Sequence, residues 1–353
     1  MFAAVYEGIG LDNSCNGVVE VVGRVAKITR IQPYFVEGDV RGRDVLSRLF
    51  SQHKMAGVIH FAGLKFLGES VENPLVYYDA NLNGLIKSRA FYGVKNLVSS
   101  CSVTVYGDPH IVPIEENLSS SATNPYGETK LIGEQILRDL GPSDGDWHTV
   151  CLRYFNPVGA HESGSIGEDP RRIPNNLMPF VAQVAIGEFE RLRVFGGDYP
   201  TLDGTGVRDY IHVMDLAQGH VAALSRLFSS CTSLTVNLDT GRGYSVLDVI
   251  RSYEKASGRV IPHEIFVRRP GDIAACYANP PWSLKFLIGG RLVQPMKCVR
   301  ILGAGSRRTL TGVFMPEMLF GNSRVCRTSL TWNRDVSTPE LLDCVLLATT
   351  EKV

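Results

Sequence analysis

The chain has 353 residues, enough for one large or two closely joined domains with a substantial core. Its 36 basic and 36 acidic side chains cancel, so no overall field favours nucleic acid or a membrane surface. Apolar runs stay well short of the ~18 residues of a spanning helix, and the first residues lack the features of a signal peptide. Scattered cysteines without a C-x-x-C pair predict reduced thiols and a cytoplasmic location.

Apolar patterning predicts strands that alternate with helices. Residues 1–11 look irregular, and Asp12 and Asn13 follow as the end of a short strand. Further strands are expected at 35–40, 58–63, 96–105, 150–155, 209–213 and 235–238, and helices at 175–187, 215–228 and 245–257. Ser245 and Asp248 resemble a capping box that opens the last of these helices. The alternation favours a parallel sheet with helices on both faces.

The sequence changes in character after Pro280. Basic residues outnumber acidic ones from there on, and glycine, serine and threonine interrupt short apolar runs. We therefore expect a weakly ordered basic tail, with a short helix at 339–349.

The most informative stretch for chemistry is Tyr126-Gly127-Glu128-Thr129-Lys130. Residues four apart lie on one face of a helix, about 5–6 Å between Cβ atoms. A free phenol has a pKa near ~10 and is a poor base, but a neighbouring ammonium lowers that pKa. Ser102, near the end of a predicted strand, can share the hydrogen bond to a reacting alcohol oxygen. An isolated pair of this kind is more often an ordinary surface pair, so the flanking sequence decides.

Long runs around this pair resemble the UDP-glucose 4-epimerase family of extended short-chain dehydrogenases/reductases. The runs are VIHFAGLK (58–65), GESVENPLVYYDAN (68–81), SVTVYGDP (102–109), NPYGETK (124–130), LRYFNPVGAHESG (152–164), GEDPRRIPNNLMPFVAQVAIG (167–187), VFGGDYPTLDGTGVRDYIHVMDLAQGHVAAL (194–224) and RRPGDIAACYANP (268–280). The resemblance implies an α/β, Rossmann-like doubly wound parallel sheet with a smaller C-terminal substrate-binding lobe. It divides the chain into an NAD-binding domain at 1–155, a mainly substrate-binding lobe with returning Rossmann elements at 156–280, and the divergent tail at 281–353.

The resemblance also implies the site residues, with NAD as cofactor and a UDP-sugar as substrate. The catalytic set is Ser102, Tyr126 and Lys130. Positions that match NAD contacts are Asp12, Asn13, Asp39, Val40, Phe61, Ala62, Gly63, Lys65, Asn81 and Phe155. Positions that match UDP-sugar contacts are Asn156, Asn176, Leu177, Arg193, Val194, Phe195, Arg208, Arg269, Asp272 and Cys276. Guanidinium groups such as those of Arg208 and Arg269 suit a diphosphate. No metal site is expected, since histidines and cysteines form no ligand-spaced group.

The implied reaction inverts C4 of the sugar. Tyr126 takes the proton of the 4-hydroxyl while a hydride leaves C4 for NAD⁺, the 4-keto sugar turns, and the hydride returns to its other face. Lys130 and the nicotinamide charge are expected to lower the pKa of Tyr126. Val103 and Thr104 stand where related dehydratases have an Asp-Glu pair, which disfavours dehydration. The small Cys276, at a size gate of the family, predicts that N-acetylated UDP-sugars are accepted as well.

The sequence also departs from the family pattern. The opening strand and its glycine-rich turn, T-G-G-x-G-Y-I-G, are absent, and neither Gly8-Ile9-Gly10 nor Gly303-Ala304-Gly305 replaces them. The helix after Asn81 looks shortened, and the tail is unrelated. These departures favour an incomplete gene model. They leave a second hypothesis open, a non-enzymatic remnant that binds UDP-sugar without NAD, and a third, another chemistry such as sugar-nucleotide decarboxylation. A homodimer is implied, with no nucleic-acid or membrane partner.

Overall fold

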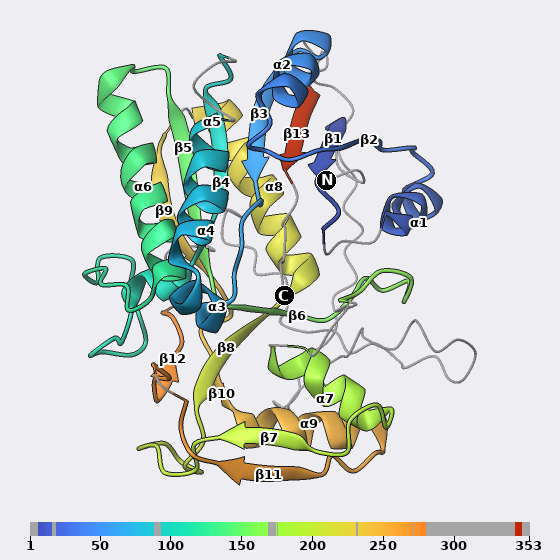
Figure 1. The fold of residues 1–353 in the computed structure, drawn as a ribbon, viewed down its shortest axis with the longest axis vertical. Helices are drawn as coiled ribbons and strands as arrows, with labels where there is room; N and C mark the ends of the chain where they lie inside the picture. The colour runs from blue at the N-terminus through green and yellow to red at the C-terminus, as the bar shows by residue number, and fades with distance from the viewer. Residues whose placement is uncertain are drawn as a thin grey trace, which may run out of the picture.

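The computed structural model describes residues 6–15, 19–87, 93–168, 174, 176–230, 232–269, 271–279 and 343–347. A seven-stranded sheet lies at its centre, in the order β2-β1-β13-β3-β4-β5-β9, and every pairing in it is parallel (Figure 1). Its strands are β1 (Gly8–Asp12), β2 (Tyr34–Glu37), β3 (Met55–His60), β4 (Asn96–Ser102), β5 (His148–Tyr154), β9 (Leu234–Leu238) and β13 (Asp343–Leu347). The predicted parallel sheet is therefore confirmed.

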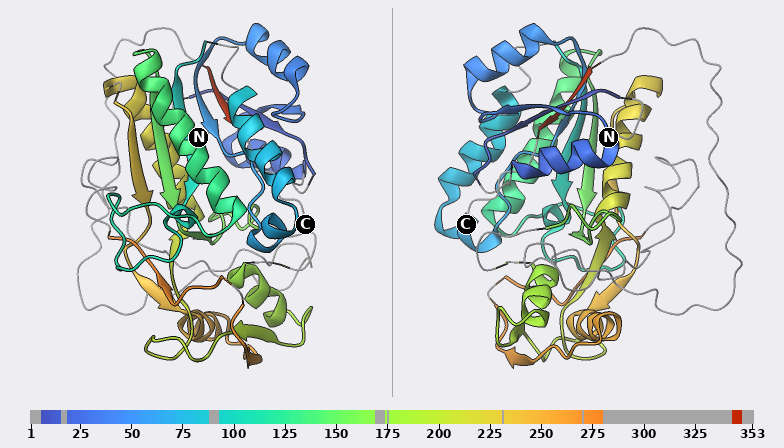
Figure 2. Two further views of the ribbon diagram at one scale, coloured as in Figure 1. Left: turned by 60° about the vertical axis from the view of Figure 1, so that its left-hand side comes forward. Right: turned by 90° about the vertical axis from the view of Figure 1, so that its right-hand side faces the viewer.

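Helices cover both faces of this sheet. They are α1 (Glu20–Thr29), α2 (Arg43–Gln52), α3 (Leu67–Glu72), α4 (Pro74–Tyr78), α5 (Gly84–Lys87), α6 (Pro125–Ser143) and α8 (Val213–Ser230). Val58 and Leu97 pack in a cluster with side chains of α2, α5 and α6. The next residue of each strand, Ile59 and Val98, packs in another cluster with side chains of α8. Successive strand residues point to opposite faces, so these helices lie on opposite sides of the sheet (Figure 2).

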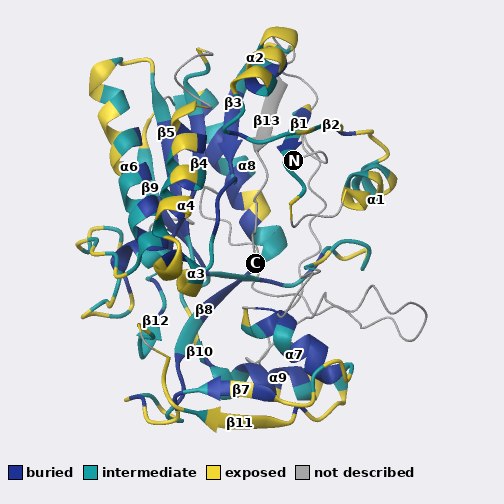
Figure 3. Ribbon diagram, viewed as in Figure 1, coloured by how far each residue is buried: buried dark blue, intermediate teal, exposed yellow. Residues whose placement is uncertain are grey.

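A smaller lobe adjoins the carboxyl end of the sheet, at the bottom of Figure 1. Its elements are β6 (Asn156–Val158), α7 (Leu177–Ala185), β7 (Leu192–Phe195), β8 (Val207–His212), β10 (Gly243–Ser245), α9 (Val246–Ser257), β11 (His263–Phe266) and β12 (Ala275–Cys276). One sheet has the order β10-β8-β12, with β6 also paired to β8, and β11 pairs with β7. The two helices bury their own apolar cluster against β7, so the lobe has a core of its own (Figure 3).

Most predicted elements are found close to their expected places. The capping box is confirmed: the Asp248 amide donates to Ser245 Oγ over 3.0 Å, and the Ser245 amide donates to Asp248 Oδ2 over 3.1 Å. The predicted strand at 96–105 ends at Ser102, after which Val103–Tyr106 form a short 3₁₀ helix, η2. A π-helical turn, Asp79–Asn83, precedes the short α5.

Two expectations for the ends of the chain were wrong. Residues 8–12 form the regular strand β1, although residues 1–11 were expected to be irregular. Residues 343–347 form the strand β13, where a helix was expected. Periodicity cannot separate strand from helix in an apolar run as short as Cys-Val-Leu-Leu, so pairing with distant strands decides. The rest of the predicted tail, 281–342 and 348–353, lies outside the described residues.

A buried ion pair ties the helix α6 to three strands. Arg153 Nη2 on β5 lies 2.6 Å from Glu134 Oε2 on α6, and Arg153 Nε donates to Glu134 Oε1 over 2.7 Å. Cys101 Sγ on β4 donates to the same Glu134 oxygen over 2.9 Å. Arg153 Nη1 also donates to the hydroxyl of Tyr106, which donates to Asn237 Oδ1 on β9. The network therefore fixes the end of β4 against α6.

No described helix is long and apolar enough to cross a membrane.

We predict that Glu134→Gln destabilises the fold strongly. The amide cannot accept both guanidinium donors, and the Arg153 charge is left unpaired in the interior, which costs about 3–5 kcal/mol. The matched control is Glu190→Gln, which removes an exposed carboxylate from Arg191 and should leave stability unchanged within error. Urea unfolding of both variants measures the difference. Equal losses in the two variants would contradict the assigned role of the buried pair.

Candidate active site

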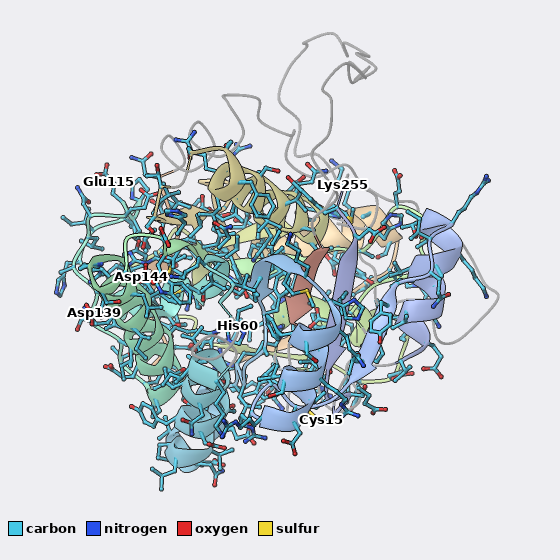
Figure 4. The ribbon with its side chains drawn as sticks, turned by 90° about the horizontal axis from the view of Figure 1, so that it is seen from above. Cys15, His60, Glu115, Asp139, Asp144 and Lys255 are labelled. Atoms are coloured by element: carbon cyan, nitrogen blue, oxygen red, sulfur yellow. The ribbon has the colours of Figure 1, made fainter. Side chains whose placement is uncertain are left out.

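The carboxyl ends of β1, β2 and β3 meet along one edge of the sheet. A cavity of about 170 Å³ lies there. It is lined by Asp12, Asn13, Cys15, Gly38, Asp39, Val40, Arg41, Gly63, Leu64, Val76 and Ala80. The strands β1 and β3 border the cavity. Their ends can be found in Figure 4 by the labelled Cys15, which follows β1, and His60, which ends β3. Open parallel sheets bind nucleotides outside the carboxyl ends of their strands, so this cavity is the candidate dinucleotide site.

An arginine that sequence analysis missed organises one wall of the cavity. Arg41 donates from Nε to Asp39 Oδ1 over 2.9 Å and from Nη2 to Asp39 Oδ2 over 2.6 Å. Its Nη1 donates to Asp79 over 2.6 Å. The hydrogen bond from Arg41 lowers the pKa of Asp39 to about 2. Burial, in contrast, raises the pKa of Asp12 on the neighbouring strand. The wall thus combines a carboxylate anchored by Arg41 with a partly desolvated one that can accept a hydrogen bond from a hydroxyl group.

Asn81 holds the opposite wall in place through its side-chain amide. The Leu64 amide donates to Asn81 Oδ1 over 2.7 Å, and Asn81 Nδ2 donates to the Leu64 carbonyl and to Thr129 Oγ1 on α6. The oxygen and the nitrogen of this buried amide are thus both used in hydrogen bonds within the protein. Gly63 lies so close that an added Cβ would be 3.0 Å from Asn81 Oδ1 and 3.6 Å from Lys130 Nζ. The loop therefore brings bare backbone next to Lys130, one of the predicted catalytic residues.

The structure brings the predicted catalytic residues together. Ser102 ends β4, and its Oγ accepts from the Thr104 amide over 3.3 Å. Tyr126 lies in the first turn of α6, is buried, and is hydrogen-bonded to Ser102. Lys130, one turn later, has its Nζ 5.8 Å from the centre of the Tyr126 ring and donates to the Ser100 carbonyl over 3.0 Å. A hydroxyl, a phenol and an ammonium thus converge beside the cavity.

The electrostatics of Tyr126 differ from the expectation. Burial is the main cause that raises the pKa of the phenol, and the nearby Tyr154 raises it further, while the Ser102 hydrogen bond opposes them. Burial also lowers the pKa of Lys130. The predicted lowering of the Tyr126 pKa is therefore wrong for the protein alone. Electrostatic interactions are stronger in a medium of low dielectric constant, so a cation bound next to the phenol would lower the pKa of Tyr126 strongly.

Arginines gather in the smaller lobe around Tyr199. The guanidinium carbon of Arg268 lies 4.2 Å from the centre of the Tyr199 ring. Arg269 lies 4.8 Å from the Phe195 ring and is paired with Asp272 over 2.9 Å. The Tyr199 hydroxyl is buried and has no hydrogen-bond partner among the described residues. Tyr199 and Arg268 were not among the predicted residues, although both stand within or beside the quoted runs.

Other predicted residues are placed less directly. The Phe61 ring packs on His220 at 4.6 Å, and the Val194 side chain lies in the core of the lobe. Phe155 and Cys276 share one buried cluster with Tyr106, which ends η2. Near the cavity, Val40 and Ala62 lie in the core beneath it, and burial lowers the pKa of Lys65. In the smaller lobe, Asn156 donates to the Asp209 carbonyl, Asn176 donates to Glu168, and Leu177 is the first residue of α7. Arg193 lies over the Phe266 ring, and Arg208 donates to the Val207 carbonyl. The described residues hold no group of side chains that could bind a metal ion.

Comparison with known proteins places the chain in a family. Residues 3–238 match the model of the NAD dependent epimerase/dehydratase family, to which the chain therefore belongs. The UDP-glucose 4-epimerase of Bacillus subtilis (strain 168) is 54% identical over 278 residues, which cover 78% of this chain and 82% of that protein. The human UDP-glucose 4-epimerase is 51% identical over 290 residues, which cover 79% and 83%.

Solved structures agree with this assignment. The UDP-glucose 4-epimerase of Bifidobacterium longum, in complex with NAD⁺ and UDP, is 50% identical with a TM-score of 0.76, covering 80% of this chain and 85% of that one. The enzyme of Stenotrophomonas maltophila, with bound NAD and formylated UDP-arabinopyranose, is 47% identical with a TM-score of 0.77, covering 79% and 84%. The cavity fits such a cofactor, because it offers carboxylates at the strand ends and a glycine whose Cβ would fill the space next to Lys130.

We predict that Tyr126 ionises at ordinary alkaline pH only when the charge of bound NAD⁺ is added to that of the nearby Lys130. Without NAD, the tyrosinate absorbance of the wild type and of Tyr126→Phe should coincide up to pH about 10, because burial raises the pKa of this phenol. With NAD bound, the wild type should show one additional tyrosinate at lower pH, and Lys130→Met should remove it. An additional group that ionises below pH about 10 without NAD would contradict this assignment.

Proposed function

We propose that this chain is an NAD-dependent UDP-glucose 4-epimerase, which interconverts UDP-glucose and UDP-galactose. The observation that carries the proposal is the convergence of Ser102, Tyr126 and Lys130 beside the cavity at the carboxyl edge of the sheet. The relatives support it, since proteins about half identical over most of the chain are UDP-glucose 4-epimerases. Galactose metabolism is then the setting in which the reaction operates.

Each catalytic residue has a role that its surroundings suit. Tyr126, ionised to the phenolate, accepts the proton of the sugar 4-hydroxyl in one half-reaction and returns it to the sugar oxygen in the other. Ser102 Oγ is hydrogen-bonded to the Tyr126 phenol and therefore lies close enough to bind the same sugar oxygen. Lys130 is fixed by the Ser100 carbonyl and places its charge near the phenol. Bound NAD would supply the hydride acceptor and donor that the oxidation and re-reduction of C4 require.

The smaller lobe supplies the charges that a UDP-sugar requires. Arg208 and Arg269 offer guanidinium forks for the diphosphate, and Arg268 stands beside them. The Tyr199 hydroxyl is buried and has no hydrogen-bond partner among the described residues, so it is a further group that can donate a hydrogen bond to a phosphate oxygen. Asn156, Asn176, Leu177, Arg193–Phe195, Asp272 and Cys276 complete the proposed substrate site.

The competing chemistries find less support. Val103 packs against the apolar cluster beside Tyr106, and Thr104 has a hydroxyl rather than a carboxylate. Neither side chain supplies the acid and base of a dehydratase. The second hypothesis, a non-enzymatic protein that binds UDP-sugar without NAD, is distinguished from the enzyme by the NAD content of the purified chain. The domain division at residues 155 and 280, a homodimer and a cytoplasmic location remain parts of this proposal.

The first test is the amount of NAD carried by the purified chain together with its activity on UDP-galactose. We expect close to one NAD per chain and a measurable formation of UDP-glucose. Tyr126→Phe should keep the NAD and lose activity by a factor of about 10² or more, because proton transfer is removed while binding is retained. A chain without NAD that is not stabilised by added NAD would refute the enzyme and favour the remnant.

We also predict that Cys276 admits the larger N-acetylated sugars. Burial raises the pKa of its thiol to about 12, so the side chain acts as a small neutral group next to Phe155. Cys276→Tyr should lower the activity on UDP-N-acetylgalactosamine relative to UDP-galactose, whereas Cys276→Ala should preserve the ratio. Coupled assays on both sugars measure it. An unchanged ratio in Cys276→Tyr, with the fold intact, would refute the size gate.

A further inference from the structure

The strand β13 occupies a gap of one strand's width in the cofactor-binding sheet. It pairs with β1 from Gly8↔Cys344 to Leu11↔Leu347, and with β3 from Cys344↔Gly57 to Leu347↔His60. Its backbone is thus bonded on both edges. Without it, β1 and β3 would stand roughly 10 Å apart, which is two strand spacings and too far for direct pairing.

The gap also separates the two walls of the cavity. Asp12, Asn13, Asp39 and Arg41 follow β1 and β2, on one side of β13. Gly63 and the residues after it follow β3, on the other side. Figure 1 shows β13, in red, between these two groups of strands. The width of the cavity therefore depends on one strand that comes from the far end of the chain.

Leaving the edges of β1 and β3 without hydrogen-bond partners would destabilise the fold. Ile9 and Leu11 on β1, and Val58 and Ile59 on β3, are all buried, so the amides and carbonyls between them have little access to water. Buried backbone groups without partners are rare in proteins and destabilising. An inserted parallel strand satisfies both edges at once, and the run Cys-Val-Leu-Leu is of the apolar kind found in strands buried on both faces.

We propose that β1 and β3 form a strand-accepting slot, that residues 343–347 insert into it, and that NAD retention depends on this insertion. A segment from residues 343–347 thereby lies inside the sheet, between two strands from the first sixty residues of the chain. The slot is specific for a parallel strand, because both neighbours run in the same direction. The statement about NAD rests on the proposed function, whereas the insertion does not.

A disulfide in the full chain tests the register. Paired Cα atoms of adjacent strands are about 5 Å apart, within the range that a disulfide spans. Gly8→Cys should therefore cross-link to Cys344 under mild oxidation, and mass spectrometry should detect the joined peptides. Gly10→Cys, which is paired with Leu346, is the matched control and should give much less of the link to Cys344. A Gly8→Cys chain that never joins residue 344 would overturn the insertion.

Val345→Pro tests the dependence of the sheet on β13. Proline removes an amide donor and is excluded from central strands, so the insertion should fail, whereas Val345→Ile should preserve it. By hydrogen exchange, peptides of β1 and β3 should exchange roughly tenfold faster or more, and those of α7 and α9 should be unchanged. The proline variant should also lose most of its NAD.

The outcomes separate the two proposals. Faster exchange at β1 and β3 in a protein that carries no NAD even as wild type would support the insertion and refute the proposed function. Unchanged exchange together with full NAD in Val345→Pro would overturn the insertion and leave the proposed function standing. Faster exchange with full NAD would overturn the dependence of the cofactor on β13. The cross-link stays informative even if the proline variant does not fold.

Discussion

The backbone amides and carbonyls of β1 and β3 face each other across the width of one strand, and β13 supplies their partners. This pairing makes a single seven-stranded sheet out of what would otherwise be two separate groups of strands. Because all its strands are parallel, their carboxyl ends lie along one edge. The acids of one group and the glycine loop of the other can then border the same cavity. The position of the cofactor site follows from that continuity.

The proposed catalytic residues depend on a second constraint, the buried ion pair between Glu134 and Arg153. Tyr126, Lys130 and Glu134 are four residues apart on α6 and lie on the same face of that helix. Glu134 is held by Arg153 and Cys101, and Cys101 directly precedes Ser102. The same pairing that anchors α6 therefore sets the place of the serine relative to the tyrosine. A buried ion pair is a costly way to stabilise a fold, but it fixes geometry well.

The charge of NAD⁺ would complement the surroundings of the proposed catalytic residues. Burial raises the pKa of Tyr126 and lowers that of Lys130, so the protein alone disfavours charge at both groups. In such surroundings a bound cation acts strongly, because little solvent screens it. The burial that raises the pKa of Tyr126 would therefore also make this phenol sensitive to the charge of a bound nicotinamide. Proton transfer would then be coupled to occupation of the site.

The amino-acid sequence by itself determined what depends on local spacing. The four-residue interval of Tyr126 and Lys130, the alternation of strands and helices, and the Ser245–Asp248 capping box all act within a few residues, and the structure bears them out. The similarity of long runs also identified the family. Other features join residues that are far apart in the chain: Arg41 with Asp79, Arg153 with Glu134 and Asn237 through Tyr106, and Tyr199 among its arginines. The placement of β13 is the clearest case. The four-residue apolar run Cys-Val-Leu-Leu has no strong preference of its own, and only two open strand edges, hundreds of residues away, decide that it becomes an inner strand of the sheet.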